Sequence, residues 1–341
     1  MQISTIGLDI AKSVFQVHGV DAEGKVVLVR QLRRKQLLEF FARLPPCLVG
    51  MEACATGHHW ARELIKLGHT VRLIPPAYVK AYVRRSKNDA ADAAAICEAV
   101  TRPSMRFVVP KTESQQARSM IFRTRDLFVR QQTQLINALR AHLAEHGVIA
   151  PQGIANLALL SEIIEEGNLG LELVVVETAR LYLEQIEVLS ARIAGLEKTL
   201  RSEAKRSEAS ARLMSMPGMG PITAMAIEAF APTMSTFRKG RDFAAWLGLV
   251  PKQHSSGGKQ QHGRTSKMGQ RDIRRLLIIG AMTVSRWACR KAPPENSWLA
   301  RMLARKPRML VAIALANKMA RSIWAMMTKN ESYNGSGLAA A

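Results

Sequence analysis

STIGLDIAKSVFQVHGVDAEGKVVLVRQL, residues 4–32, decides the fold of the amino-terminal third of this chain. Its three short runs, 4–10, 14–20 and 25–32, are rich in β-branched residues and separated by turn residues, so we expect three consecutive strands. Strand and helix patterns then alternate: a helix over 34–44, a strand over 47–53, a helix over 58–68, a strand over 70–76 and an alanine-rich helix over 89–100. This order predicts an α/β domain with a mixed sheet and flanking helices.

The middle of the chain has helical patterns. Residues 114–147 are helical and basic, and 171–203 carries apolar residues at alternating spacings of four and three. Sustained over more than three heptads, this seam predicts either a coiled coil that joins copies into a homodimer or homotetramer, or a helical hairpin within one chain. The seam consists of Val175, Ala179, Tyr182, Ile186, Leu189, Ile193, Leu196 and Leu200.

The carboxyl-terminal part is expected to be mainly helical. Short helices follow Ser207, a long apolar and basic helix covers about 306–328, and the end has the composition of a frayed tail. We therefore expect an α/β domain followed by α regions, divided as 1–112 (metal domain), 113–206 (helical, coiled coil), 207–329 (mainly helical domain) and 330–341 (disordered tail).

The charge of the chain indicates a polyanionic partner. The 341 residues carry a net charge of +22 with a pI near 10.5, and nucleic acid is the first candidate because each neutralised phosphate releases counterions. An anionic membrane is a weaker candidate, since the longest apolar stretches are far short of a spanning helix. We expect no signal peptide. Cys47, Cys54, Cys97 and Cys289 form no CxxC pair, which favours a reducing cytoplasm without zinc or disulfides.

Four acidic residues suggest a metal site. Asp9 and Glu52 each interrupt an apolar strand pattern, and Asp89 and Asp92 are three apart on one helical face. A buried carboxylate is costly without a cation or metal beside it, and carboxylate oxygens are the ligands that magnesium and manganese prefer. The alternative is that Asp89 caps the helix while Asp9 and Glu52 pair with nearby cations. The four together favour a divalent metal.

The order of these acids on the strand pattern resembles the ribonuclease H-like fold in its RuvC resolvase form. An actin-like ATPase also opens with a similar strand, but the glycine-rich phosphate loops that it requires at later strands are missing from this sequence.

Pro217-Gly218-Met219-Gly220 lies between two apolar helical runs. It resembles a helix-hairpin-helix, in which Gly218 and Gly220 would let backbone N–H groups reach a DNA phosphate at a helix N-terminus. A plain turn between packed helices is an equal alternative. It is not a P-loop, because no GK[ST] follows.

A basic stretch surrounds the sequence Ser255-Ser256-Gly257-Gly258. Taken alone, it is more typical of a mobile anion-binding loop than of a catalytic serine, because a serine nucleophile needs activation. Its cations are candidate nucleic-acid contacts: Lys252, Lys259, Arg264, Lys267, Arg271, Arg274 and Arg275.

Six motifs in combination resemble one family, the DEDD transposases of insertion-sequence family one-ten, which are related to Piv-type DNA invertases. The motifs are GLDIAK (7–12), MEACATGHHWAR (51–62), RRSKNDAADA (84–93), MPGMGPITA (216–224), FAAWLGLVPKQHSSGGK (243–259) and RTSKMGQRDIRRLLIIGA (264–281). The spacing in MEACATG is similar to subgroup eleven-eleven.

The resemblance implies a RuvC-like metal domain in which Asp9, Glu52, Asp89 and Asp92 bind the metal. It also implies a coiled coil and a transposase domain in which Ser256 attacks a DNA phosphate to form a covalent phosphoserine link. A partner subunit's metal site would complete the active site, and a structured guide RNA would pair with target and donor DNA. Ser255 is the alternative nucleophile, and Ser256 is favoured because it directly precedes the glycine.

Three functions therefore stay open: a DNA recombinase that uses serine and metal, a RuvC-like nuclease that uses metal-activated water, and a non-enzymatic nucleic-acid-binding scaffold. The family resemblance favours the first, acting in the cytoplasm on nucleoid DNA.

Overall fold

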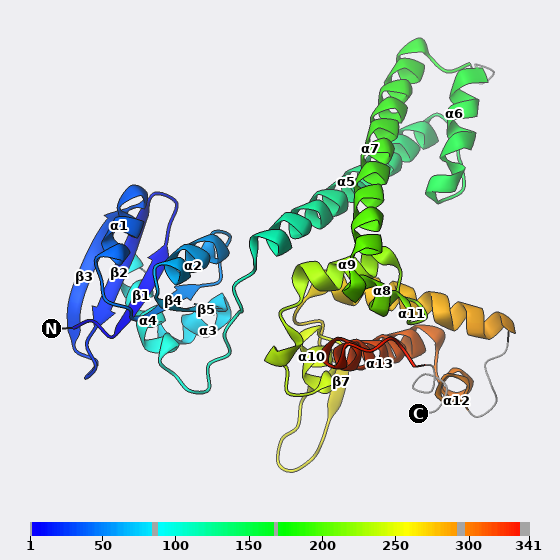
Figure 1. Ribbon diagram of the computed structural model, residues 1–341. Helices are drawn as coiled ribbons and strands as arrows, with labels where there is room; N and C mark the ends of the chain where they lie inside the picture. Colours follow the sequence, from blue (N-terminus) through cyan, green and yellow to red (C-terminus); the bar gives the residue numbers. More distant parts are fainter. Residues whose placement is uncertain (1, 84–87, 167–169, 292–296, 335–341) are drawn as a thin grey trace. The chain divides into compact units, whose positions relative to one another are not determined.

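The computed structural model describes residues 2–83, 88–166, 170–291 and 297–334, with the side chain of His262 left out. The chain divides into two compact units, Met1–Glu113 and Ser114–Ala341. Figure 1 shows a sheet with helices in the first unit and an almost wholly helical second unit. The expected α/β-plus-α organisation is confirmed at this level, whereas the finer boundaries at 206/207 and 329/330 stay predictions.

A five-stranded mixed sheet forms the centre of the first unit. Its strands are β1 (Thr5–Ile10), β2 (Val14–Val20), β3 (Val26–Arg33), β4 (Leu48–Glu52) and β5 (Thr70–Ile74). The order is β3-β2-β1-β4-β5; β1 to β3 pair antiparallel, while β4 pairs parallel with both β1 and β5. The predicted mixed sheet is confirmed. Short antiparallel connections join β1 to β3, and helices make the crossovers that parallel neighbours require.

Helices cover both faces of this sheet. The helical segments are η1 (Arg34–Gln36), α1 (Leu37–Ala42), α2 (Gly57–Lys66), α3 (Pro76–Val79), η2 (Lys80–Tyr82) and α4 (Asp89–Val100). Ile6 and Leu8 of β1 share one core with Phe41 of α1 and Trp60 of α2. Because side chains alternate along a strand, Gly7 and Asp9 face the other side, where α4 packs.

Two long helices begin the second unit. They are α5 (Glu113–Glu145) and α7 (Leu173–Arg206), with η3 (Ile154–Asn156) and α6 (Leu157–Glu166) between them. One core cluster joins Leu139 of α5, Leu160 of α6 and Ile186 of α7, and Leu200 of α7 belongs to the core of the carboxyl-terminal helices. The heptad seam thus packs largely inside one chain, as the helical-hairpin alternative expects; a coiled coil between copies stays a prediction.

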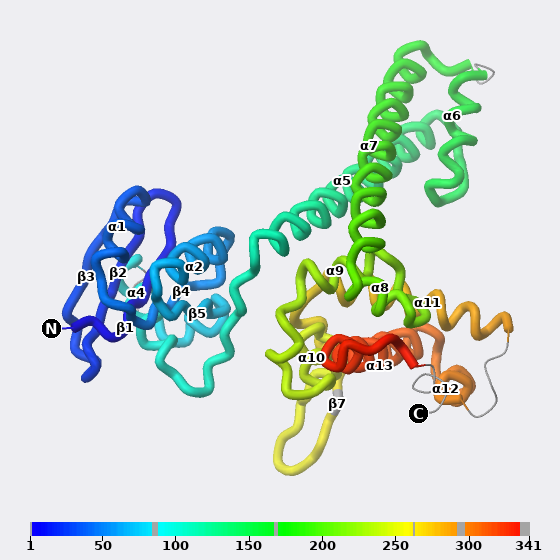
Figure 2. The backbone as a smooth tube through the Cα atoms, viewed as in Figure 1, coloured from blue at the N-terminus to red at the C-terminus, as the bar shows by residue number. Residues whose placement is uncertain are grey.

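The carboxyl-terminal helices surround a large apolar core. Its elements are α8 (Glu208–Met214), α9 (Pro221–Phe230), η4 (Met234–Thr236), α10 (Gly240–Trp246), β6 (Pro251–Gln253), β7 (His262–Thr265), α11 (Arg271–Lys291), α12 (Trp298–Arg305) and α13 (Arg308–Lys329). Figure 2 traces this path, including the narrow β6–β7 excursion.

Among the described residues, α13 is the one helix long and apolar enough to cross a membrane, and half of its most apolar window is buried inside the protein. That burial is typical of a core helix. The chain is still packed just beyond it, because the Tyr333 N–H donates to Ser215 Oγ at 2.8 Å. The disordered tail over 330–341 stays a prediction, and 335–341 lie outside the described residues.

Candidate functional site

Asp9 and Glu52 lie on the two neighbouring parallel strands at the centre of the sheet. Leu8 of β1 pairs with Met51 of β4, the last pair of these two strands. The next residues, Asp9 and Glu52, therefore lie side by side just beyond this pair. Both side chains are partly buried. The carboxyl ends of parallel strands are where α/β sheets place functional groups, and these two acids occupy that edge.

α4 carries the other two acids to the same edge. A Cβ atom on Gly7 would lie 2.5 Å from Cys97 N, and one on Gly50 would lie 2.7 Å from Val100 Cβ. The two strand glycines therefore allow α4 to lie directly on the sheet. Cys97 Sγ is 3.8 Å from the carbonyl oxygen of Thr5, so α4 runs opposite to β1 and its first turn, with Asp89 and Asp92, lies toward Asp9.

Asn88, rather than Asp89, caps this helix. The Asn88 side-chain oxygen accepts the Ala91 N–H at 2.7 Å, which satisfies one of the unpaired donors of the first turn. The alternative in which Asp89 acts as the cap is therefore wrong. Asp89 is exposed and Asp92 partly buried in the first turn, and neither serves as the cap.

The other acids change the electrostatics of Asp9. Burial and then the charges of Asp92, Asp89 and Glu52 raise the pKa of Asp9 from 3.8 to about 6, while a backbone hydrogen bond at Ile10 opposes the change. The other three carboxylates are thus within electrostatic range of Asp9. A divalent cation would relieve their repulsion, and a carboxylate set of this kind fits magnesium or manganese.

The acids approach one another without enclosing an ion. Across the ranges that the structure describes, no three His, Cys, Asp or Glu side chains converge closely enough to hold a metal as they stand. Side-chain rotation, above all of the exposed Asp89, would have to accompany binding. The four residues at positions 84–87 of the RRSKNDAADA motif lie outside the described residues.

Ser256 lies at the tip of a β-hairpin that the sequence did not reveal. β6 and β7 pair antiparallel, and the His254 N–H donates to Gln261 O at 2.9 Å above them. The Lys259 N–H closes the turn on Ser256 O at 3.1 Å. Gly257 and Gly258 have φ of 56° and 76°, the positive values that a type I′ hairpin turn requires at both central positions. The mobile loop expected from the sequence is thus a turn of defined geometry.

The two serines differ in their hydrogen bonds. Ser255 Oγ accepts the Gln261 N–H at 3.3 Å, which ties this hydroxyl to the opposite arm of the hairpin. Within the described part of the chain, Ser256 Oγ makes no hydrogen bond, and the residue is exposed. A hydroxyl that is already engaged is less available to attack than an unengaged one, so the geometry favours Ser256.

The predicted basic contacts fall into two groups. Lys252, Lys259, Arg264, Lys267 and Arg271 are exposed around the hairpin. Arg274 differs, because its Nη1 donates to Leu247 O at 2.8 Å and its burial lowers its pKa. Arg275 Nη1 lies 2.7 Å from Asp126 Oδ1 on α5. Arg274 is therefore a structural anchor for the end of α10, whereas Arg275 is exposed and partly neutralised by Asp126. The sequence alone did not reveal that Arg274 is partly buried.

The two glycines of the α8–α9 connection also differ. Gly218 has φ +84°, and a Cβ atom there would lie 2.8 Å from Gly280 O of α11. Gly218 is thus required for the close packing of this turn on α11, as the plain-turn alternative expects. Gly220, directly before α9, is exposed with no atom near its Cβ position, and it keeps the open backbone that a phosphate contact needs.

Comparison with known proteins connects these two regions. Residues 6–147, with all four acids, match the DEDD transposase family of the insertion sequence IS110, and residues 210–295, with Ser256, match the transposase IS116/IS110/IS902 family. The chain is 48% identical over 335 residues to a "Probable family 20 transposase" of Pseudomonas aeruginosa, covering 98% of this chain and 99% of that one.

The chain belongs to the IS116/IS110/IS902 family of transposases. It is 39% identical to the transposase for insertion sequence element IS1328 of Yersinia enterocolitica, covering 96% of this chain and 97% of that one. It is also 37% identical to the transposase for insertion sequence element IS1111A of Coxiella burnetii, covering 97% and 91%. This transposase is an enzyme of DNA strand transfer. Its subgroup and any relation to Piv-type invertases stay predictions.

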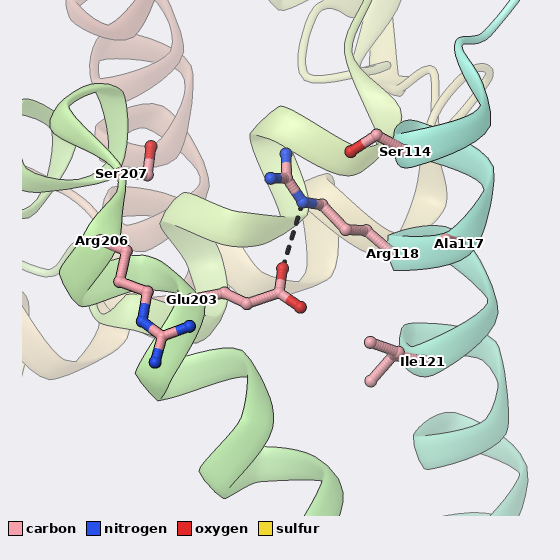
Figure 3. Close-up of a pocket in the computed structure, with 7 residues that line it drawn as sticks. All are labelled: Ser114, Ala117, Arg118, Ile121, Glu203, Arg206 and Ser207. Carbon is pink, nitrogen blue, oxygen red and sulfur yellow. Dashed lines mark hydrogen bonds and ion pairs between the residues drawn. The ribbon is translucent and has the colours of Figure 1, made fainter.

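A cavity of about 480 Å³ in the second unit of the transposase lies between α5 and the end of α7. Figure 3 shows Arg118 reaching across it to Glu203, with Arg206 and Ser207 on the same wall. Arg118 Nε is 3.1 Å from Glu203, and its Nη1 is 3.3 Å from Glu228. Two carboxylates therefore already balance the charge of Arg118.

Glu228 is a structural residue that sequence reasoning missed. Its Oε1 accepts the hydroxyls of Ser207 at 2.6 Å and Ser210 at 2.5 Å, while its other oxygen meets Arg118. Glu228 of α9 therefore ties the start of α5 to the junction of α7 and α8. Its place in the apolar run MAIEAF was the available signal, since an acid buried there needs partners.

Proposed function

We propose that this transposase cuts and rejoins DNA through a covalent link between Ser256 Oγ and a DNA phosphate. The observation that carries the proposal is the exposed, unengaged Ser256 hydroxyl at the tip of a hairpin, surrounded by exposed cations. The family supplies the reaction class, DNA strand transfer. The cations Lys252, Lys259 and Arg264 would bind the phosphates on either side of the reacting one.

The reaction exchanges one phosphate ester for another, so each bond formed replaces a bond broken. Ser256 Oγ loses its proton and bonds to phosphorus, while the bond from phosphorus to one DNA oxygen breaks and that oxygen gains a proton. A DNA hydroxyl then attacks the phosphoserine, releases Ser256 and restores a phosphodiester. The energy of the original bond is kept, so rejoining needs no nucleotide cofactor.

Asp9, Glu52, Asp89 and Asp92 would hold the divalent cation, magnesium or manganese. When bound, such a cation supplies positive charge that stabilises the developing charge on phosphate and leaving oxygens. The raised pKa of Asp9 supports this assignment, since its carboxylate lies among three others that repel it. The acids belong to the first unit and Ser256 to the second, and we propose that both act on the same phosphodiester, within one chain or between two.

The test is a covalent adduct that survives denaturation. Wild-type protein with end-labelled DNA from the element's termini is expected to give a labelled band after heating in detergent. Ser256→Ala should lose that band while still binding DNA, and Ser255→Ala is the matched control that should keep it. Cleavage by Ser256→Ala at the wild-type rate would refute the serine mechanism.

A metal-dependent nuclease without a covalent intermediate is the second candidate, because the four acids alone suffice to activate water. It predicts cleavage by Ser256→Ala that is lost in Asp9→Asn and in chelator. A non-enzymatic scaffold predicts no strand breakage with any metal, which the family relationship already argues against.

We also propose a structured guide RNA and self-association as parts of this function. The net charge of +22 is compatible with a bound RNA, and purification from cells followed by RNA sequencing tests the RNA directly. Val174, Leu181 and Val188 of α7, seven residues apart, are exposed at 60%, 65% and 42%. This stripe would support a homodimer or homotetramer, and light scattering that shows only monomer with DNA bound would contradict it.

A further inference from the structure

The carboxyl-terminal half of α11 exposes a tryptophan. Trp287 is 58% exposed, although indoles usually bury most of their surface. The residues that α11 turns into the core are Ile273, Leu277, Gly280, Ala281 and Ser285, and Trp287 is not among them. In Figure 1 this half of α11 extends beyond α8 and α9. The indole therefore contributes little to the core and needs another explanation.

One cation lies over this indole, and two more are near it along α11. Lys291 Nζ lies 4.4 Å from the centre of the Trp287 ring, and Arg286 and Arg290 are exposed. Among the described residues, none of these three cations has an ion-pair partner, and positions 273–291 contain no acidic residue. An exposed aromatic ring within unpaired positive charge matches a ligand that combines a flat π-face with negative charge.

We propose that Trp287 is a stacking platform for an unpaired DNA base, with Arg286 and Arg290 binding the adjoining phosphates. A single strand offers free base faces, and base–indole stacking tolerates any sequence. Intact duplex offers mainly base edges and phosphates, because its base faces are stacked on one another. This inference rests on the strand-transfer function, in which a strand must leave its old partner before it joins a new one.

The positions along α11 suit a strand that follows the helix. Arg275, Ile279, Arg286 and Arg290 fall within about 60° of one another at 3.6 residues per turn, whereas Trp287 and Lys291 lie about 60° and 100° farther round the helix than Arg290. Arg275 and Arg290 are fifteen residues apart, which corresponds to about 22 Å of helix. This length spans several nucleotides and links the platform to the cations next to the hairpin.

The experiment measures binding of fluorescent single-stranded DNA to the full chain in chelator, where no strand transfer occurs. Trp287→Ala should bind roughly tenfold more weakly, the loss expected for one stacked base, and Trp287→Phe should stay close to wild type. Met309→Ala removes a similarly exposed apolar side chain (53%) from α13, outside the proposed binding face, and is the matched control. Replacing Arg286 and Arg290 with Gln should reduce the salt slope by about 1.4, at about 0.7 per phosphate contact on single strands.

Several outcomes would overturn the proposal. They are wild-type binding by Trp287→Ala, an equal loss on duplex DNA, a loss confined to RNA, or an equal loss in Met309→Ala, which would indicate a general effect of removing exposed apolar surface. Because binding is measured without catalysis, adduct formation by wild type tests the serine mechanism separately. A normal adduct together with unaffected binding by Trp287→Ala would remove this inference alone.

Discussion

Replacing Asp9 with Asn should stabilise the amino-terminal unit at neutral pH when no metal is present. The charged form of Asp9 is disfavoured in the folded protein, since burial and three carboxylates raise its pKa from 3.8 to about 6. At about 1.4 kcal/mol for each pKa unit this corresponds to about 3 kcal/mol. Asp9 is only partly buried, so solvent screening reduces the expected gain to about 1–2 kcal/mol.

The stability difference between Asp9→Asn and wild type should depend on pH. A raised folded-state pKa means that ionised Asp9 destabilises the fold fully above about pH 6 and progressively less between pH 6 and 4, with no effect once the unfolded chain is also protonated. Asp9→Asn should thus exceed wild type at pH 8, and the difference should disappear near pH 4. Magnesium should stabilise wild type more than the variant.

Amide hydrogen exchange in peptides covering β1 and β4 measures the stability difference, because protection factors report the local free energy of opening. Glu23→Gln, which removes an exposed carboxylate from the Asp21–Lys25 turn of the same unit, is the control and should change nothing. Equal or lower protection in Asp9→Asn at pH 8, or a difference that does not vary with pH, would refute the reasoning.

Two further predictions concern stability, one through packing and one through hydrogen bonds. Gly7→Ala should lower the free energy of unfolding by about 3 kcal/mol through overpacking and weaken the response to magnesium, because its Cβ would lie 2.5 Å from Cys97 N. By contrast, Gly195→Ala has open space in the exposed middle of α7 and should raise the free energy of unfolding by about 0.5–1 kcal/mol. Denaturant unfolding compares the two variants, and equal effects would contradict the close contact of α4 with Gly7. Glu228→Gln should lower the free energy of unfolding by about 1–3 kcal/mol, because it weakens the hydrogen bonds to Ser207, Ser210 and Arg118. Glu208→Gln, where Glu208 is 93% exposed, should be neutral. Thermal unfolding compares the two, and a neutral Glu228→Gln would contradict the role of Glu228 in tying α5 to α7 and α8.

The sheet was predictable because local signals and tertiary demands agree in it. Strands β1 to β5 consist of β-branched runs separated by turn residues, and Asp9 and Glu52 stood out as acids in apolar strands. Their approach to Asp89 and Asp92 depends on Gly7 and Gly50, whose role becomes visible only when α4 is placed on them.

The hairpin and the anchoring cations were harder to predict for physical reasons. β6 and β7 are short and polar, so they lack the alternation that marks a strand; the Gly257-Gly258 pair was the available signal. A heptad seam specifies an apolar partner but not whether that partner is another chain, and in α7 it is largely α5 and α6. Arg274 resembles its neighbours in sequence, and only its contact with Leu247 O distinguishes it.

The hairpin that carries Ser256 has a length that can be changed. Among the described residues, no atom lies within 4 Å of the Cβ positions of Gly257 and Gly258, so both glycines of the tip face open space. Two residues added to each arm would keep the facing of every side chain and move the serine outward by about 7 Å, which is about two phosphate spacings along a DNA strand. Under the serine mechanism, hairpin length would then act as a molecular ruler: lengthened variants should shift the joined phosphate by a fixed number of nucleotides.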